Sequence, residues 1–307
     1  MFRQSVFQKI TTAVLVATLV VMLGSAAAYA QSLEAASVSG KSGSGASIES
    51  GGTPDLTTQA TKTKAYVLKS ITRESIYGHS DDSSTVYTST YSFNYNTKGL
   101  LTKETVKQNG KTTVTRYSYT GDKLKKVEYP TSMATAKYDE NGRLLQYTDE
   151  TTAGPNSGIN SSVYSFSYKS GKISSVCETQ IHNFNGRVTT NTIDDALKYK
   201  NAKLVKTIRK AGDREYTFTY LYDEKGNVVK SKGMFGTSTC KNTYNSRGLL
   251  AKQTYNAATD NGTTKHEYTF TYEPIMVSKS LASEVNAQRW ALQNRNLDYT
   301  LGPLSRS

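Results

Sequence analysis

A turn motif that recurs along the chain places the strongest constraint on what this sequence can fold into. The stretch YLYDEKGNVV, from Tyr220 to Val229, places an Asp and a Gly between two runs of aromatic and β-branched residues. Upstream, the aromatic residues from Tyr216 to Tyr222 take every second position, which is the period of a strand with one buried face. Asp223 can accept a hydrogen bond from the backbone two residues on, and Gly226 adopts a positive φ without steric cost. The stretch therefore predicts a β-hairpin closed by a type I turn and a glycine bulge.

The same turn occurs three more times, in YNTKGLL, YDENGRLL and YNSRGLL, which begin at Tyr95, Tyr138 and Tyr244. Shortened copies begin at Tyr119, Tyr168 and Tyr199, where a two-residue loop in place of a three-residue loop keeps the strand faces in register. These tyrosines start units of 19 to 31 residues, a spacing typical of repeat architectures. The residues predicted to have a structural role in the four full turns are Asn96, Gly99, Asp139, Gly142, Asp223, Gly226, Asn245 and Gly248.

A second set of turn signals, such as Asn109-Gly110 and Asn185-Gly186, lies between these motifs. Together the two sets divide residues 65–278 into about sixteen strands, so we expect an all-β, antiparallel up-and-down meander. An open sheet of this size tends to curl or split, which predicts a curled or half-barrel shape. The segment from about Ser280 to Asn294 is expected to form a short helix that covers an edge or the open mouth of the sheet.

The turns YDENGRLL and YDEKGNVV, each preceded by alternating aromatic residues, resemble the tyrosine–aspartate (YD) repeats of bacterial Rhs proteins and teneurins. The resemblance extends from about Tyr91 to Tyr272. In that family each repeat is a β-hairpin, and many repeats wind into a shell around a cargo or toxin segment. This chain has too few repeats to enclose a large cargo, so we expect a short exported member without a toxin domain. The residues to which the resemblance gives a structural role are Tyr138, Asp139, Gly142, Tyr222, Asp223 and Gly226.

The N-terminal residues 1–30 read as a signal peptide, with Arg3 and Lys9 before an apolar run that ends in Ala28-Tyr29-Ala30. A retained membrane anchor is the alternative, because the apolar run is nearly long enough to span a bilayer. Residues 31–64 have almost no large apolar side chains and are predicted to form a flexible low-complexity tether. The repeat domain then covers residues 65–278, and residues 279–307 form a tail. These features predict a bacterial protein that is secreted or associated with the cell surface or wall.

The chain is basic, with a formal net charge of +13. Without residues 1–30, which hold Arg3 and Lys9 and no acid, the charge becomes 13 − 2 = +11. The lysines are spread through the predicted strands, which indicates either a solvated face or attraction to an anionic cell-wall polymer. A nucleic-acid partner is not expected, because none of the usual motifs is present. Cys177 and Cys240 permit one disulfide, or two unpaired thiols.

No pattern of catalytic or metal-binding residues stands out. The histidines, His79, His182 and His266, lack ligand spacing to one another or to a cysteine, so neither a metal nor a cofactor is predicted. Asp139 and Asp223 could be taken for the paired carboxylates of a glycosidase. However, Asn96 and Asn245 occupy the same turn position, and Asn makes the turn hydrogen bond but cannot act as a general acid. We therefore expect a protein that is not an enzyme.

The chain has twenty-two tyrosines, whose phase along the predicted strands indicates a buried face. Our leading hypothesis is a non-catalytic exported protein of the cell surface or wall that acts as an interaction scaffold. The alternatives are a carrier of a lipid or other apolar ligand in a curled sheet, and a carbohydrate-binding module in which aromatic rings stack on sugars. An outer-membrane barrel is disfavoured because stretches such as TTVTRYSYT have polar residues on both faces. A hydrolase with scattered catalytic residues ranks lowest.

Overall fold

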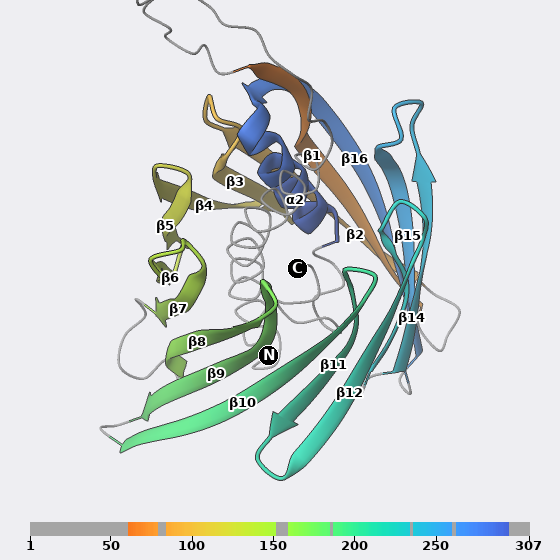
Figure 1. Cartoon of the computed structure of the whole chain (residues 1–307). Coiled ribbons are helices and arrows are strands. Elements are labelled where there is room, and N and C mark those ends of the chain that lie inside the picture. Colours follow the sequence, from red (N-terminus) through yellow and green to blue (C-terminus); the bar gives the residue numbers. More distant parts are fainter. Residues whose placement is uncertain are drawn as a thin grey trace, which may run out of the picture.

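A closed barrel of sixteen antiparallel strands, followed by a short helix, forms the body of the protein in this computed structural model (Figure 1). The structure describes residues 61–78, 84–151, 159–184, 187–233, 236–259 and 262–294. The predicted signal peptide, most of the predicted tether, the end of the tail and His79 lie outside these ranges.

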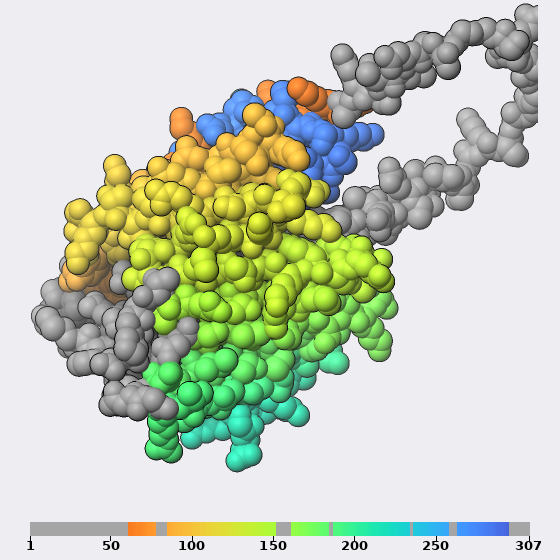
Figure 2. Space-filling view, turned by 90° about the vertical axis from the view of Figure 1, so that its left-hand side faces the viewer, coloured from red at the N-terminus to blue at the C-terminus, as the bar shows by residue number. Residues whose placement is uncertain are grey.

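Each strand pairs with its neighbours in chain order, and the last strand pairs with the first. Figure 2 shows one side of the barrel, where successive strands form a continuous wall. The strands are β1 (Lys62–Gly78), β2 (Ser84–Tyr95), β3 (Leu101–Gln108), β4 (Lys111–Thr120), β5 (Lys123–Glu128), β6 (Ser132–Tyr138), β7 (Leu144–Thr151), β8 (Ile159–Lys169), β9 (Lys172–Phe184), β10 (Arg187–Lys200), β11 (Lys203–Ala211), β12 (Arg214–Tyr222), β13 (Val228–Gly233), β14 (Gly236–Tyr244), β15 (Leu250–Thr259) and β16 (Gly262–Ser278).

The predicted antiparallel meander of sixteen strands is confirmed, whereas the predicted curled or half-barrel sheet is wrong. The sheet closes because β1 and β16, each 17 residues long, pair along almost their whole length, from Lys62 with Ser278 to Tyr77 with Thr264. Closure removes both exposed sheet edges, which would otherwise offer unpaired backbone groups to other chains. The first strand begins at Lys62, three residues inside the segment predicted as a tether.

The two faces of the wall differ sharply in composition. In β12, Phe218 and Tyr220 are buried, whereas Thr217 and Thr219, between and beside them, are exposed. The same alternation recurs in the other strands, and the buried members join one hydrophobic cluster that includes residues from every part of the wall. The aromatic face therefore points into the barrel, and a face rich in Thr, Ser and Lys points to solvent.

Helix α2 (Ala282–Asn294) follows a short 3-10 turn, η1 (Lys279–Leu281), and lies inside the ring of strands at one mouth of the barrel (Figure 1). The predicted terminal helix is thus present. It crosses the mouth: Gln288 accepts a hydrogen bond from the backbone N–H of Leu101, and the indole of Trp290 donates to the carbonyl of Gly226 (2.9 Å). Its Val285 packs so closely on the first full turn that a Cβ added at Gly99 would lie 2.8 Å from it. The helix therefore closes this mouth of the barrel.

A ladder of tyrosine hydroxyls links most of the repeats to their neighbours; at Tyr244 the hydroxyl donates to the carboxylate of Asp223 instead. The hydroxyl of Tyr168 donates to the backbone carbonyl of Leu144 (2.9 Å), the aliphatic residue that follows the preceding turn. Leu144 lies beyond the last residue pair between β7 and β8, which is Gln146 with Ser165, so its carbonyl has no backbone partner on that side. The equivalent bonds are Tyr95 to Leu68, Tyr119 to Leu101, Tyr138 to Leu124, Tyr222 to Leu204 and Tyr272 to Leu250.

The residue before each of these aliphatic positions is often basic, and its cation lies over the same tyrosine ring. The guanidinium of Arg143 lies 5.2 Å from the ring centre of Tyr168, and the ammonium of Lys203 lies 5.6 Å from that of Tyr222. Cation–π contacts of this kind contribute about 0.5–1 kcal/mol at exposed sites. Part of the positive charge of the chain is therefore structural, at the turns.

We predict that Tyr168→Phe lowers the free energy of unfolding by about 1 kcal/mol, because the carbonyl of Leu144 loses its hydrogen bond while the ring remains. Tyr216→Phe is the matched control: Tyr216 packs against the same hydrophobic cluster but is not part of the ladder. Urea denaturation of both variants measures the difference. Equal stability of the two variants would contradict the role of the ladder.

Candidate functional site

The inner wall near the other mouth differs from the rest of the lumen, because polar and aromatic side chains alternate there. It is built by β1, β2, β15 and β16, whose register aligns two rows of inward-facing residues. The first row is Gln253, Tyr268, Arg73 and Ser89, and the second is Tyr255, His266, Ser75 and Tyr87. We call these two rows, together with Tyr77, the polar–aromatic wall.

Four of its rings contact one another. His266 stacks on Tyr255, with ring centres 5.6 Å apart and planes 19° apart. Tyr77 meets both His266 (6.0 Å, 80°) and Tyr87 (5.9 Å, 72°) edge to face. Tyr77 and Tyr87 are 38% and 41% exposed, so solvent reaches the outer end of this aromatic cluster.

Four buried polar atoms of the polar–aromatic wall have no hydrogen-bond partner. They are Nε of Arg73, Oγ of Ser75, Oε1 of Gln253 and Nδ1 of His266. The side chains of Ser75 and Gln253 are each only 1% exposed. Leaving a buried polar group unpaired costs about 1–3 kcal/mol, and such groups are rare in folded proteins. Four of the seven such atoms in the described part of the chain lie on the three adjacent strands β15, β16 and β1, and this concentration marks the wall as a site rather than a part of the scaffold.

Arg73 is the only charged side chain in the two rows. Its guanidinium donates to Oγ of Ser89 over 3.4 Å and lies 6.0 Å from the ring centre of Tyr91. Burial, with a smaller contribution from Arg73, lowers the pKa of His266 to about 4, so this imidazole is neutral at physiological pH. The polar–aromatic wall therefore presents one cation with no carboxylate beside it in the rows.

The facing part of the lumen is acidic. Asp195 forms a two-pronged ion pair with Arg209 (2.8 and 2.9 Å), and Glu178 accepts a hydrogen bond from Tyr164 (3.1 Å). Burial raises the pKa of Asp149 to about 6. These groups lie on β7 to β11. The arginine partner of Asp195 and the tyrosine partner of Glu178 are typical of satisfied buried acids, whereas Oδ1 of Asp149 has no hydrogen-bond partner.

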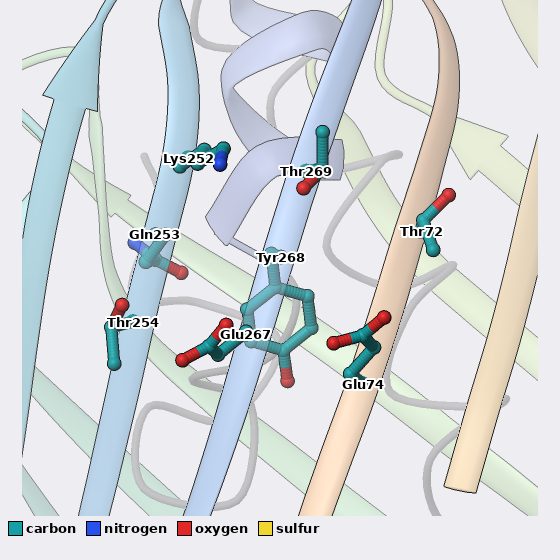
Figure 3. Close-up of a pocket in the computed structure, with 8 residues that line it drawn as sticks. All are labelled: Thr72, Glu74, Lys252, Gln253, Thr254, Glu267, Tyr268 and Thr269. Carbon is teal, nitrogen blue, oxygen red and sulfur yellow. The ribbon is translucent and has the colours of Figure 1, made fainter.

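A shallow furrow of about 210 Å³ also lies across β1, β16 and β15. Figure 3 shows it from outside the barrel, with Glu74 and Glu267 on neighbouring strands and the ring of Tyr268 behind β16. Glu74 and Glu267 are direct cross-strand partners, and Glu267 forms an ion pair with Lys265 (2.6 Å). The furrow is open to solvent and has no buried nucleophile, so it has the character of a solvated outer surface.

The predicted turn residues all lie at the mouth that α2 closes, away from the polar–aromatic wall. Gly99, Gly142, Gly226 and Gly248 have φ values of +79°, +79°, +81° and +75°. The preceding Asn or Asp accepts a hydrogen bond from the backbone N–H four residues on, as in Asp223 with Asn227 (2.9 Å). Asp223 does more than close its turn, because its second oxygen accepts from the side chains of Asn242 (2.9 Å) and Tyr244.

The two cysteines do not form the disulfide that the sequence permits, because both are free thiols. Cys177 lies on β9 and Cys240 on β14, five strand positions apart around the barrel. A disulfide requires Cα atoms within about 7 Å, little more than one strand spacing. Burial raises the pKa of Cys240 to about 12, which makes this thiol unreactive.

Within the part of the chain that the structure describes, no three His, Cys, Asp or Glu side chains lie close enough to hold a metal ion. None of the helices in that part is long and apolar enough to cross a membrane. Sequence reasoning missed the polar–aromatic wall because its residues come from both ends of the repeat domain. The one local signal of this wall was the stretch TRESIY, in which Arg73, Ser75 and Tyr77 take every second position and so share one face of a strand.

Comparisons with known proteins leave the family open. No family model and no curated protein matches the chain. Among solved structures, a porin-like protein from Bacteroides uniformis is 15% identical with a TM-score of 0.47, and one from Bacteroides vulgatus is 8% identical with a TM-score of 0.42. Each match covers 67% of this chain and 98% of the other. At these values the likeness supports no conclusion about function.

Glu284, in the first turn of α2, has a carboxyl group whose burial disfavours its charged form. Burial, and secondarily the charge of Asp122, raises the pKa of Glu284 to about 8. Tyr119 and Tyr138, whose own pKa values are raised mainly by burial, also face it. The folded protein therefore favours the protonated form of Glu284. Because its folded pKa exceeds the usual value of 4.5, this contribution to the free energy of unfolding is fully present below about pH 4.5 and is lost as the pH rises towards 8.

We predict that Glu284→Gln raises the free energy of unfolding by about 1–3 kcal/mol at pH 8.5 and leaves it unchanged at pH 4, because Gln cannot ionise. Denaturation at several pH values measures the gap between variant and wild type. Glu224→Gln, at an exposed turn position, is the control and should show no such divergence. A constant gap at all pH values would contradict the assignment.

Proposed function

We propose that this chain is an exported, non-catalytic β-barrel that works in water and holds a ligand in its lumen. The distribution of side chains on the two faces of the wall is the observation that supports it. A membrane barrel needs an apolar band about 25 Å tall on its outer face. Here the outward residues are mainly Thr, Ser and Lys, as in β14, where Thr237, Thr239 and Lys241 face outwards.

The exposed apolar side chains do not form such a band. Val86, Leu145, Val188, Leu221 and Met276, each 45–60% exposed, lie on five different strands. Scattered apolar residues of this kind are normal on soluble proteins. The wall is therefore suited to water on its outside.

The inside suits a ligand. A ring of sixteen strands encloses more space than the inward side chains of its own wall can fill, as the aqueous channels of porins of about 16–18 strands illustrate. Helix α2 closes one mouth, while half-exposed Tyr77 and Tyr87 stand at the other. Export through residues 1–30 and a secreted or surface location are part of the proposal, as is the absence of catalysis, which the structural role of the Asp and Asn turn positions supports.

The test uses the chain expressed in full, so that the host can process residues 1–30 if they act as a signal peptide. We expect a folded, monodisperse protein without detergent. We also expect its melting temperature to rise with at least one ligand class among fatty acids, neutral oligosaccharides and acidic oligosaccharides, because binding to the folded state alone stabilises it. A protein that stays dispersed only in detergent, or no response to any class, would overturn the proposal.

A cell-wall-associated scaffold is the second candidate, and the basic outer face favours it. Lys230, Lys232 and Lys241 are exposed and lie together on the neighbouring strands β13 and β14. Such a patch attracts anionic polymers, and salt screens the attraction.

We predict that the protein sediments with purified cell wall at low salt and is released as salt is added. Replacing Lys230, Lys232 and Lys241 by Glu should weaken this binding about tenfold or more. The control is Arg73→Gln, which removes a positive charge inside the lumen and should leave binding to the cell wall unchanged. Absence of binding at every salt concentration would exclude this candidate.

A further inference from the structure

We propose that the polar–aromatic wall binds a saccharide that carries a carboxylate. This inference rests on the proposed function, since it names the class of ligand that the lumen takes. Three features of the wall support it: its rings, its unpaired polar atoms and its single cation.

The rings provide the stacking surface. Tyr77 and Tyr87 are partly exposed at the mouth and meet edge to face, so they offer two differently oriented rings to an entering molecule. Behind them, the stacked pair of Tyr255 and His266 continues the aromatic surface into the lumen. Tyrosine rings with an apolar face and a polar tip suit ligands that have both C–H and O–H groups, as pyranose rings do.

The unpaired polar atoms require a ligand with both donors and acceptors. Oε1 of Gln253 can only accept and Nε of Arg73 can only donate, whereas Oγ of Ser75 can do both. A sugar hydroxyl both donates and accepts, so a row of hydroxyls can satisfy all of them. A fatty acid chain would cover these atoms without pairing them, at a cost of about 1–3 kcal/mol each.

The cation selects a carboxylate among saccharide substituents. Arg73 is the only charged side chain in the rows, and its one hydrogen bond there, to Ser89, is long at 3.4 Å. A guanidinium binds a planar carboxylate through two parallel N–H···O bonds, and such pairs are stronger than neutral hydrogen bonds. The neutral His266 adds no competing charge.

The experiment measures binding of a uronic acid trisaccharide and of its neutral counterpart to the full-length protein by isothermal titration calorimetry. We expect the acidic trisaccharide to bind at least tenfold more tightly. Arg73→Met should remove this preference. The control, Arg116→Met on the outer face of β4, should leave it intact.

Ser75→Ala separates a binding role from a structural one. Removing an unpaired buried hydroxyl should raise the melting temperature of the ligand-free protein while it weakens binding of the acidic trisaccharide. A purely structural hydroxyl would lower the melting temperature instead. Should Arg73→Met fail to fold, Tyr87→Ala at the exposed rim serves as the second variant, with an expected loss of about tenfold or more in affinity.

Three results would overturn the inference. Equal binding of both trisaccharides, unaffected by Arg73→Met, would exclude recognition of the carboxylate. A response to fatty acids alone would exclude a saccharide but leave the proposed lumen-binding function standing. No response to any class would exclude both.

Discussion

The hydrogen bond from a tyrosine hydroxyl to the carbonyl behind the preceding turn fixes how consecutive repeats sit beside one another. Loops of two and of three residues both occur along the chain, yet Tyr119 and Tyr138, which precede loops of different length, make the same bond, to Leu101 and Leu124. The bond sets the level at which each turn stands relative to its neighbour. All turns therefore meet at one rim, and α2 can bind across that rim, to Leu101 on one side and Gly226 on the other. A repeat with phenylalanine at this position would keep the hydrophobic packing but lose this alignment.

Local features of the fold could be predicted from the sequence, whereas long-range ones could not. The turn at Asp223, the period-two strands and the terminal helix each depend on a few neighbouring residues. Closure depends on β1 and β16, which pair residues as distant as Lys62 and Ser278, and no local pattern identifies them as partners. The polar–aromatic wall could not be predicted from the sequence for the same reason. His266 lacks ligand spacing along the chain, yet it faces Ser75 directly across the closing pair of strands.

The arrangement of polarity bears on what kind of barrel this is. Outer-membrane barrels place apolar residues outwards and polar ones inwards. This wall does the opposite over most of its height, with Phe218 and Tyr220 inside and Thr217 and Thr219 outside. Near the mouth opposite α2 the inner face changes again, and Arg73, Ser75 and His266 replace the aliphatic residues. That change is a departure from the repeat pattern, and departures of this kind are expected at functional sites. The kinship to YD-repeat proteins stays a prediction.

The pairing of the first strand with the last has a consequence for how the molecule assembles. Hairpins can form as soon as their own residues are available, but the ring cannot close until β16, the last strand of the barrel, reaches β1. Contacts between such distant residues carry a large entropic cost before they stabilise anything, so closure is expected to be the slow step of folding. Until then both edges of a fifteen-strand or shorter sheet are free to pair with other chains. A chain of this design therefore has to avoid pairing with other chains at its two free sheet edges until its last strand has been synthesised.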